Sequence, residues 1–139
     1  MSIRLLIVDD HAKVHMAIAA MIARIDDIDV VGQANDGEQA IAYIERAVAG
    51  QSPSIDLLLL DLNLPRRSGV DILKSLRSID RYSETPVVVM TGSDAPKDRE
   101  ATAQDAVHYF VKPSTLAEFI RLGSLVRDIL SGGIPEGSL

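Results

Sequence analysis

The chain has no cysteine and no tryptophan among its 139 residues, and only 4% of them are aromatic. Without cysteine the protein cannot form a disulfide, use a thiolate nucleophile or bind a metal or cluster through sulfur. Neither of the glycine-rich phosphate-binding patterns GxxxxGK[ST] and GxGxxG occurs. The sequence therefore excludes thiol chemistry and the common nucleotide-binding loops, and a reducing compartment is the expected location.

Long apolar runs and an excess of positive charge are also missing. The first apolar run, residues 5–8, stops at Asp9 and is too short for a signal peptide or a membrane span. The net charge is −6, and Arg66 and Arg67 form the only adjacent basic pair, whereas nucleic-acid binding needs a clustered basic face. We expect a cytoplasmic protein with neither nucleic acid nor a membrane as a direct partner.

The sequence does contain a regular alternation of short apolar runs and helical patterns. Short apolar runs predict strands at residues 3–8, 29–34, 57–60, 86–90 and 107–111, and the unbroken run at 57–60 is typical of a strand buried on both faces. Apolar residues at helical spacing predict helices at residues 12–25, 40–48, 69–78 and 115–130. A short, loosely held helix is expected at residues 95–106, which are largely charged and contain few large apolar side chains. Thr115 and Glu118 are expected to cap the last of these helices. Residues 1–130 are thus one predicted domain, and 131–139 a disordered tail.

Five strands alternating with five helices predict an α/β fold with one parallel sheet. In the flavodoxin-like doubly wound strand order 2-1-3-4-5, the first and third strands are neighbours where the order reverses. Ligands of such sheets bind at this point, beyond the carboxyl ends of the strands. We therefore expect the functional site where residues 3–8 and 57–60 end.

Four of the five predicted strands end on polar side chains, which this topology would bring together: Asp9 and Asp10, Asp61, Thr91, and Lys112. Neighbouring carboxylates repel one another unless a cation lies among them, and a set of hard oxygen ligands favours Mg²⁺. The ammonium of Lys112 and the hydroxyl of Thr91 could each contact a phosphoryl oxygen. These residues indicate phosphoryl transfer onto an aspartate.

The same residues, in the same order, resemble the motifs of the receiver domains of two-component response regulators, over about residues 3–130. The matching motifs are the acidic pair Asp9-Asp10, Asp61 in DLNLP followed by Pro65 and Gly69, Thr91, and Lys112-Pro113. The resemblance implies a phosphorelay switch and no enzyme acting on a separate substrate. It would take its phosphoryl group from a histidine kinase or a histidine phosphotransfer protein and signal by protein–protein contact. We read the chain as a stand-alone receiver without an output domain.

The resemblance also assigns roles in the acidic pocket. It implies that Asp61 is the phosphoacceptor and that Lys112 contacts the phosphoryl group. Asp10, Asp61 and the backbone carbonyl of Asn63 would bind Mg²⁺ directly, whereas Asp9 would act through a water molecule. The receiver would catalyse its own phosphotransfer and its own dephosphorylation.

Further roles concern the signal and its duration. By the resemblance, Thr91 is the switch hydroxyl and Tyr109 the switch aromatic. The alternative for Tyr109 is a strand residue that only packs on the last helix, and both can hold at once. Asn63 and Ser93, each two residues after a motif residue, would tune the lifetime of the phosphoryl group.

The last predicted helix carries more apolar residues than one sheet face can cover, about twice the required arc. This pattern predicts that the edge formed by Leu122, Leu125 and Ile129 is partly exposed. Together with the strand around Tyr109, this edge is expected to form a homodimer or kinase-docking face. The alternative is that neighbouring helices or the tail cover the excess.

Two other functions and a histidine metal site are less well supported by the sequence. A phosphatase of the haloacid-dehalogenase type needs a second aspartate two residues after the nucleophile, where this chain has Asn63. A non-phosphorylated adaptor would have no reason to keep buried charges that cost stability. His11 and His15 have the spacing of a metal pair, but the glutamate and third ligand of a zinc helix are missing.

Overall fold

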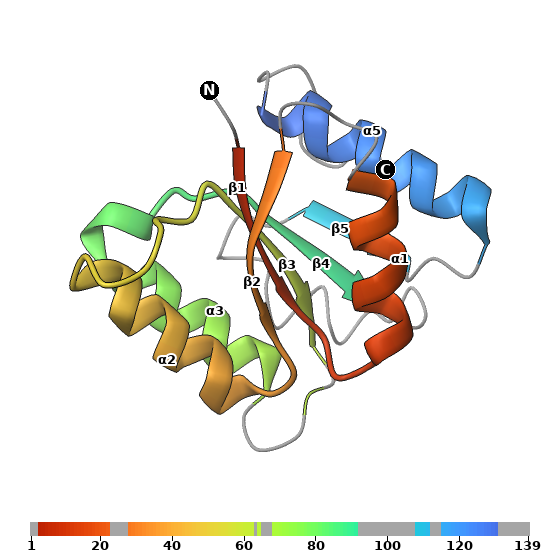
Figure 1. Ribbon diagram of the computed structural model, residues 1–139. Helices are drawn as coiled ribbons and strands as arrows, with labels where there is room; N and C mark the ends of the chain where they lie inside the picture. The colour runs from red at the N-terminus through yellow and green to blue at the C-terminus, as the bar shows by residue number, and fades with distance from the viewer. Residues whose placement is uncertain are drawn as a thin grey trace.

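The structure is a computed structural model that describes residues 3–22, 28–62, 64, 68–91, 108–111 and 115–130 (Figure 1). The strands are β1 (Ile3–Val8), β2 (Ile28–Ala34), β3 (Leu57–Asp61), β4 (Val87–Thr91) and β5 (His108–Val111). The helices are α1 (Ala12–Ile22), α2 (Gly37–Val48), α3 (Gly69–Arg77), the short 3₁₀-helix η1 (Asp80–Tyr82) and α5 (Leu116–Leu130). All five predicted strands are confirmed, each with bounds within one residue of the expected ones.

The five strands form one parallel sheet in the order β2-β1-β3-β4-β5, which confirms the predicted topology. In the pair of β1 and β3, Val8 lies opposite Leu60. The next residue of each strand path is an aspartate, Asp9 in one and Asp61 in the other. The register of two central strands therefore brings these two carboxylates to the same edge of the sheet.

Helices cover both faces of the sheet, α2 and α3 on one and α1 and α5 on the other (Figure 1). Successive residues of a strand point to opposite faces, so that both sets of leucines in β3 are buried. Leu58 and Leu60 pack in the core beside α2 and α3, whereas Leu57 and Leu59 pack in the core beside α1 and α5. This two-sided burial explains the unbroken apolar run of the sequence.

Four α-helices lie in the described part of the chain, so the predicted number of five is unconfirmed. The expected helix at residues 95–106 and the expected tail at 131–139 lie outside the described residues. The capping prediction is confirmed: the backbone N–H of Glu118 donates to Oγ1 of Thr115 at 3.2 Å. Among the described residues, no helix has the length and apolar character that a membrane crossing requires.

The predicted exposure of the α5 edge is wrong for two of its three residues, Leu122 and Leu125. Leu122 is 0% exposed and Leu125 is 4% exposed, and only Ile129 is half-buried. The reason is that α1 packs against α5, and Ile18 and Met21 of α1 share one core cluster with both leucines. The alternative, that a neighbouring helix covers the excess apolar arc, is confirmed for this edge.

Candidate functional site

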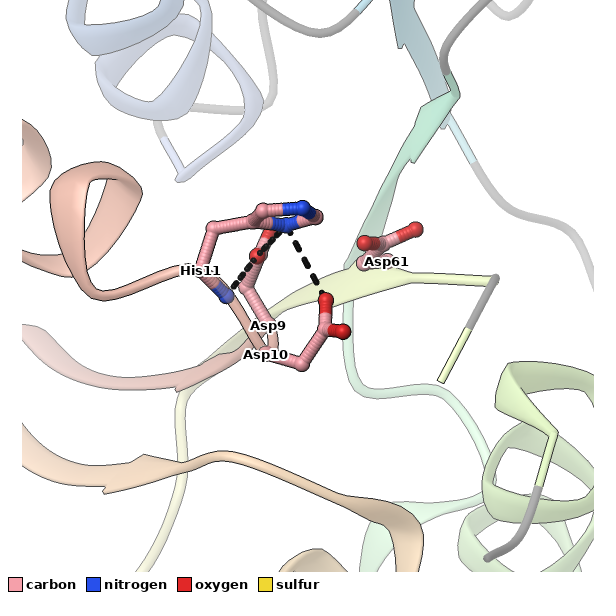
Figure 2. Close-up of side chains that lie close together, drawn as sticks. All are labelled: Asp9, Asp10, His11 and Asp61. Atoms are coloured by element: carbon pink, nitrogen blue, oxygen red, sulfur yellow. Dashed lines mark hydrogen bonds and ion pairs between the residues drawn. The ribbon is translucent and has the colours of Figure 1, made fainter. Parts of the chain in front are cut away.

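Four side chains converge beyond the ends of β1 and β3 (Figure 2). They are Asp9, Asp10 and His11 from the turn after β1, and Asp61 from the end of β3. One potential ligand atom of each lies within 4.8 Å of those of the other three. Asp61 is 4% exposed and is therefore buried. The structure thus brings together the three carboxylates that the sequence predicted as one cluster.

Asp9 is the most firmly held of the three carboxylates. Its side chain is fully buried, and its backbone N–H donates to the carbonyl of Ala34 at the end of β2 at 3.0 Å. Its Oδ1 accepts a hydrogen bond from the backbone N–H of His11 at 2.8 Å. Asp10 follows with a side chain that is one-third exposed. Two of the three acids are therefore buried, and Asp10 is the one that reaches solvent.

His11 belongs to this group as well, which the sequence analysis missed. Its Nδ1 lies 3.0 Å from Oδ1 of Asp9 and 3.0 Å from Oδ1 of Asp10. Because a carboxylate has no hydrogen to give, Nδ1 is the donor in these contacts. The signal that could have found His11 was its position directly after the acidic pair, and not its spacing from His15.

His15 contacts the backbone of Asp9 and not its carboxylate. It is buried in α1, and its Nε2 lies 2.6 Å from the backbone carbonyl oxygen of Asp9. The carbonyl can only accept, so Nε2 carries the hydrogen and donates it. The rings of His11 and His15 thus contact different groups of Asp9, its carboxylate and its backbone carbonyl respectively.

The chain after Asp61 is held by a close contact with the start of α3. The backbone N–H of Gly69 donates to the carbonyl of Leu62 at 3.1 Å. A β-carbon at Gly69 would lie 2.6 Å from Cα of Leu62 and 2.7 Å from the carbonyl oxygen of Asp61. Both neighbours are backbone atoms that cannot turn away, so only glycine lets α3 begin this close to the pocket.

Of the other predicted site residues, the structure describes Thr91 and Tyr109. Thr91 is the last residue of β4, one position beyond Met90, which lies opposite Asp61. Tyr109 of β5 is partly buried and packs on the core beside α2 and α3, the face opposite to α5. The alternative that it packs on the last helix is therefore wrong. Asn63, Ser93 and Lys112 lie outside the described residues.

Comparison with known proteins gives the family. The model of the family described as response regulator receiver domain matches residues 5–122. The transcriptional regulatory protein PdtaR of Mycobacterium tuberculosis is 33% identical over 119 residues, a match that covers 84% of this chain and 53% of PdtaR. The chain therefore spans about half the length of this relative.

Two solved structures have the same fold. The phosphorylated cyanobacterial phytochrome response regulator RcpA superimposes with a TM-score of 0.82 at 22% identity, over 99% of this chain and 100% of its own. The Mn²⁺-bound form of response regulator Rcp1 gives a TM-score of 0.79 at 23% identity, over 97% of this chain and 99% of its own. From the family match and the fold together, the chain belongs to the response regulator receiver domains of two-component systems.

Proposed function

We propose that this receiver domain accepts a phosphoryl group on Asp61 from a histidine kinase or a histidine phosphotransfer protein, with Mg²⁺ as cofactor. The observation that carries the proposal is the position of Asp61, a buried carboxylate at the end of a central strand with two further carboxylates within 4.8 Å. A buried group of acids is costly unless a cation joins it. This cost supports a cation as part of the working site.

The donor set fits a hard divalent cation. Asp10, Asp61 and the carbonyl of Asn63 would hold Mg²⁺ directly, and buried Asp9 would act through a water molecule. When bound, Mg²⁺ would neutralise charge on the phosphoryl oxygens and on the carboxylate that attacks the phosphorus. The solved structure of Rcp1 is of a Mn²⁺-bound protein, which supports a divalent site in this fold.

The reaction itself needs little from the protein beyond position and charge. A carboxylate oxygen of Asp61 attacks the phosphorus in line, the bond from phosphorus to the histidine nitrogen of the donor breaks, and its electron pair stays on that nitrogen. Lys112 would contact the phosphoryl oxygens, and the hydroxyl of Thr91 would bind another of them. The product is an acyl phosphate, which water later hydrolyses at a rate that Asn63 and Ser93 would set.

The signal leaves through a change of shape rather than through turnover of a separate substrate. Thr91 moving toward the phosphoryl group would leave space for Tyr109 to turn inward. Tyr109 lies on the strand next to β4, partly buried against the α2 and α3 core, so the two residues are on neighbouring strands. A protein partner that contacts this end of β5 would sense the change.

Intact-mass spectrometry after incubation with acetyl phosphate tests the proposal. We expect wild type to gain one phosphoryl group in the presence of Mg²⁺ and none after addition of EDTA. Asp61→Asn keeps the size of the side chain but removes the nucleophilic carboxylate, and it should gain nothing in either condition. Labelling of Asp61→Asn to the wild-type level would overturn the assignment.

A further inference from the structure

The longest strand of the sheet, β2, lies at its edge. β2 has seven residues, whereas the strand at the other edge, β5, has four. The backbone N–H and C=O groups on the outer side of an edge strand are available to a strand of another molecule. Among the described residues, no strand pairs with the outer side of β2. Its sequence, IDVVGQA, has one charge, no proline and three β-branched residues, a composition that favours strand pairing.

β2 is nevertheless irregular in its middle. Val30 lies opposite Leu5 of β1, but the next residue of β1, Leu6, lies opposite Gly32. Val31 is therefore an extra residue, a β-bulge, and bulges are rare between parallel strands. A bulge bends its strand and interrupts the regular spacing of the backbone hydrogen-bonding groups. The outer edge of β2 is thus interrupted at Val31.

Packing against α2 holds the bulge in place. Leu6, Val31 and Tyr43 all pack in the core beside α2 and α3. A β-carbon at Gly32 would lie 2.8 Å from Cε2 of Tyr43 and 3.0 Å from Cδ1 of Leu6. The ring of Tyr43 is also fixed at its far end, because its hydroxyl donates to the carbonyl of Pro53 at 2.8 Å. The position opposite Leu6 therefore has no room for a side chain, and the extra residue contributes its side chain to the core instead.

We propose that the bulge at Val31 keeps the outer edge of β2 from pairing with the β2 of a second copy of this chain. Two copies related by a two-fold axis would bring the same edge together with the two strands antiparallel. An antiparallel ladder needs hydrogen-bonding groups at regular intervals along both strands. The bulge leaves only three residues on each side of it in regular register with β1. The domain can therefore expose its longest strand without its sheet continuing into a second molecule.

Deletion of Val31 from the full chain tests the proposal, because Gly32 then follows Val30 directly and β2 is regular along its whole length. Val31→Ala is the matched control, since it loses most of the same core contacts but keeps the extra residue. In sedimentation equilibrium the deletion variant should have twice the mass of wild type, whose single chain is 15.0 kDa, at a concentration where Val31→Ala matches wild type. A folded deletion variant with the wild-type mass would overturn the proposal. So would a Val31→Ala variant that associates as strongly as the deletion.

Spin labels show whether the new contact is made by β2. The chain has no cysteine, so Gln33→Cys, at an exposed residue of β2, gives a single site for labelling. In dimers of the deletion variant the two labels should lie within about 30 Å of each other, because β2 is only about 23 Å long at 3.3 Å per residue. The same label in the otherwise wild-type chain should give no such distance. A short distance in that chain, or dimers whose labels lie farther apart, would contradict the proposal.

A second variant covers the case in which the deletion of Val31 does not fold, which far-UV circular dichroism would show. Deletion of Gly32 combined with Tyr43→Leu also removes the extra residue, and the smaller side chain leaves room for Val31 opposite Leu6. This variant should associate in the same way. If neither variant folds, the core and not the free edge requires the bulge, and the proposal fails. None of these measurements depends on phosphorylation of Asp61, so the proposed function is tested separately.

Discussion

A β-carbon placed on Gly69 would lie 2.7 Å from the carbonyl oxygen of Asp61, so the first residue of α3 touches the backbone of the proposed phosphoacceptor. Real atoms at that separation would overlap, and the carbonyl oxygen is part of a strand backbone held between two neighbours. The beginning of α3 and the position of Asp61 are therefore mechanically linked. Any side chain at Gly69 must displace one of them.

Gly69→Ala should accordingly destabilise the fold by about 3 kcal/mol, the upper range for forcing extra atoms into a packed site. It should also weaken Mg²⁺ binding, because Asp61 is displaced. Gly50→Ala is the matched control: Gly50 has a φ of 79° and nothing near its missing β-carbon, so only backbone strain of about 1 kcal/mol is expected. Urea unfolding and Mg²⁺ titration measure both effects. Equal losses of Mg²⁺ affinity in the two variants would contradict this link.

Mg²⁺ should stabilise the wild-type fold, since an ion that binds only the native cluster adds about 2.7 kcal/mol at 100 times its dissociation constant. Asp61→Asn should raise the melting midpoint of the metal-free protein by a few degrees, because one of three neighbouring negative charges is removed. It should also lose most of the gain from Mg²⁺. Thermal melts in Mg²⁺ and in EDTA decide the matter, and identical wild-type midpoints in both would count against the metal site.

His15→Leu should cost about 1–2 kcal/mol of stability, because it leaves the carbonyl of Asp9 without the hydrogen that Nε2 donates at 2.6 Å. Mg²⁺ should also bind more weakly, since Asp9 loses a constraint. Met16→Leu on the same helix serves as control, because Met16 is exposed and should tolerate the change without measurable loss. If His15→Leu matched Met16→Leu in chemical unfolding, the hydrogen bond would have no role in holding the pocket.

Leu125→Glu should destabilise the protein by about 4 kcal/mol, because it puts a carboxylate into a core position without a partner. Ile120→Glu on the same helix is the matched control, since Ile120 is 50% exposed and should change stability by less than about 0.5 kcal/mol. Far-UV circular dichroism during urea unfolding compares them. A Leu125→Glu variant as stable as Ile120→Glu would mean that the α5 edge is an open surface after all.

The sheet and the acid cluster were predictable from sequence because each depends on a local pattern. An unbroken apolar run means a strand with both faces buried, and in a parallel sheet the residue after such a run is placed at a known edge. Asp61 after Leu60 and Asp9 after Val8 are two examples of this rule. The family resemblance added roles to these residues, but the topology alone already grouped them.

The wrong or missing predictions concern features that depend on packing between segments far apart in the sequence. The apolar arc of α5 looked too wide for one sheet face, and nothing in its own sequence says that α1 packs on it. The short helix η1 was missed for a similar reason. It is held by the guanidinium of Arg77, which donates to the carbonyls of Tyr82 and Thr85 at 3.0 and 2.7 Å. These contacts form only in the folded protein, and no local sequence pattern predicts them.

The central claim is that the phosphoryl group is carried by Asp61, and one measurement tests it most directly. Borohydride reduction of the acetyl-phosphate-treated protein converts an aspartyl phosphate to homoserine, and peptide mass spectrometry then locates the converted residue. We predict conversion at Asp61 alone, dependent on Mg²⁺, with Asp9 and Asp10 unchanged. Conversion at another aspartate, or none in a protein that has gained a phosphoryl group, would contradict the account.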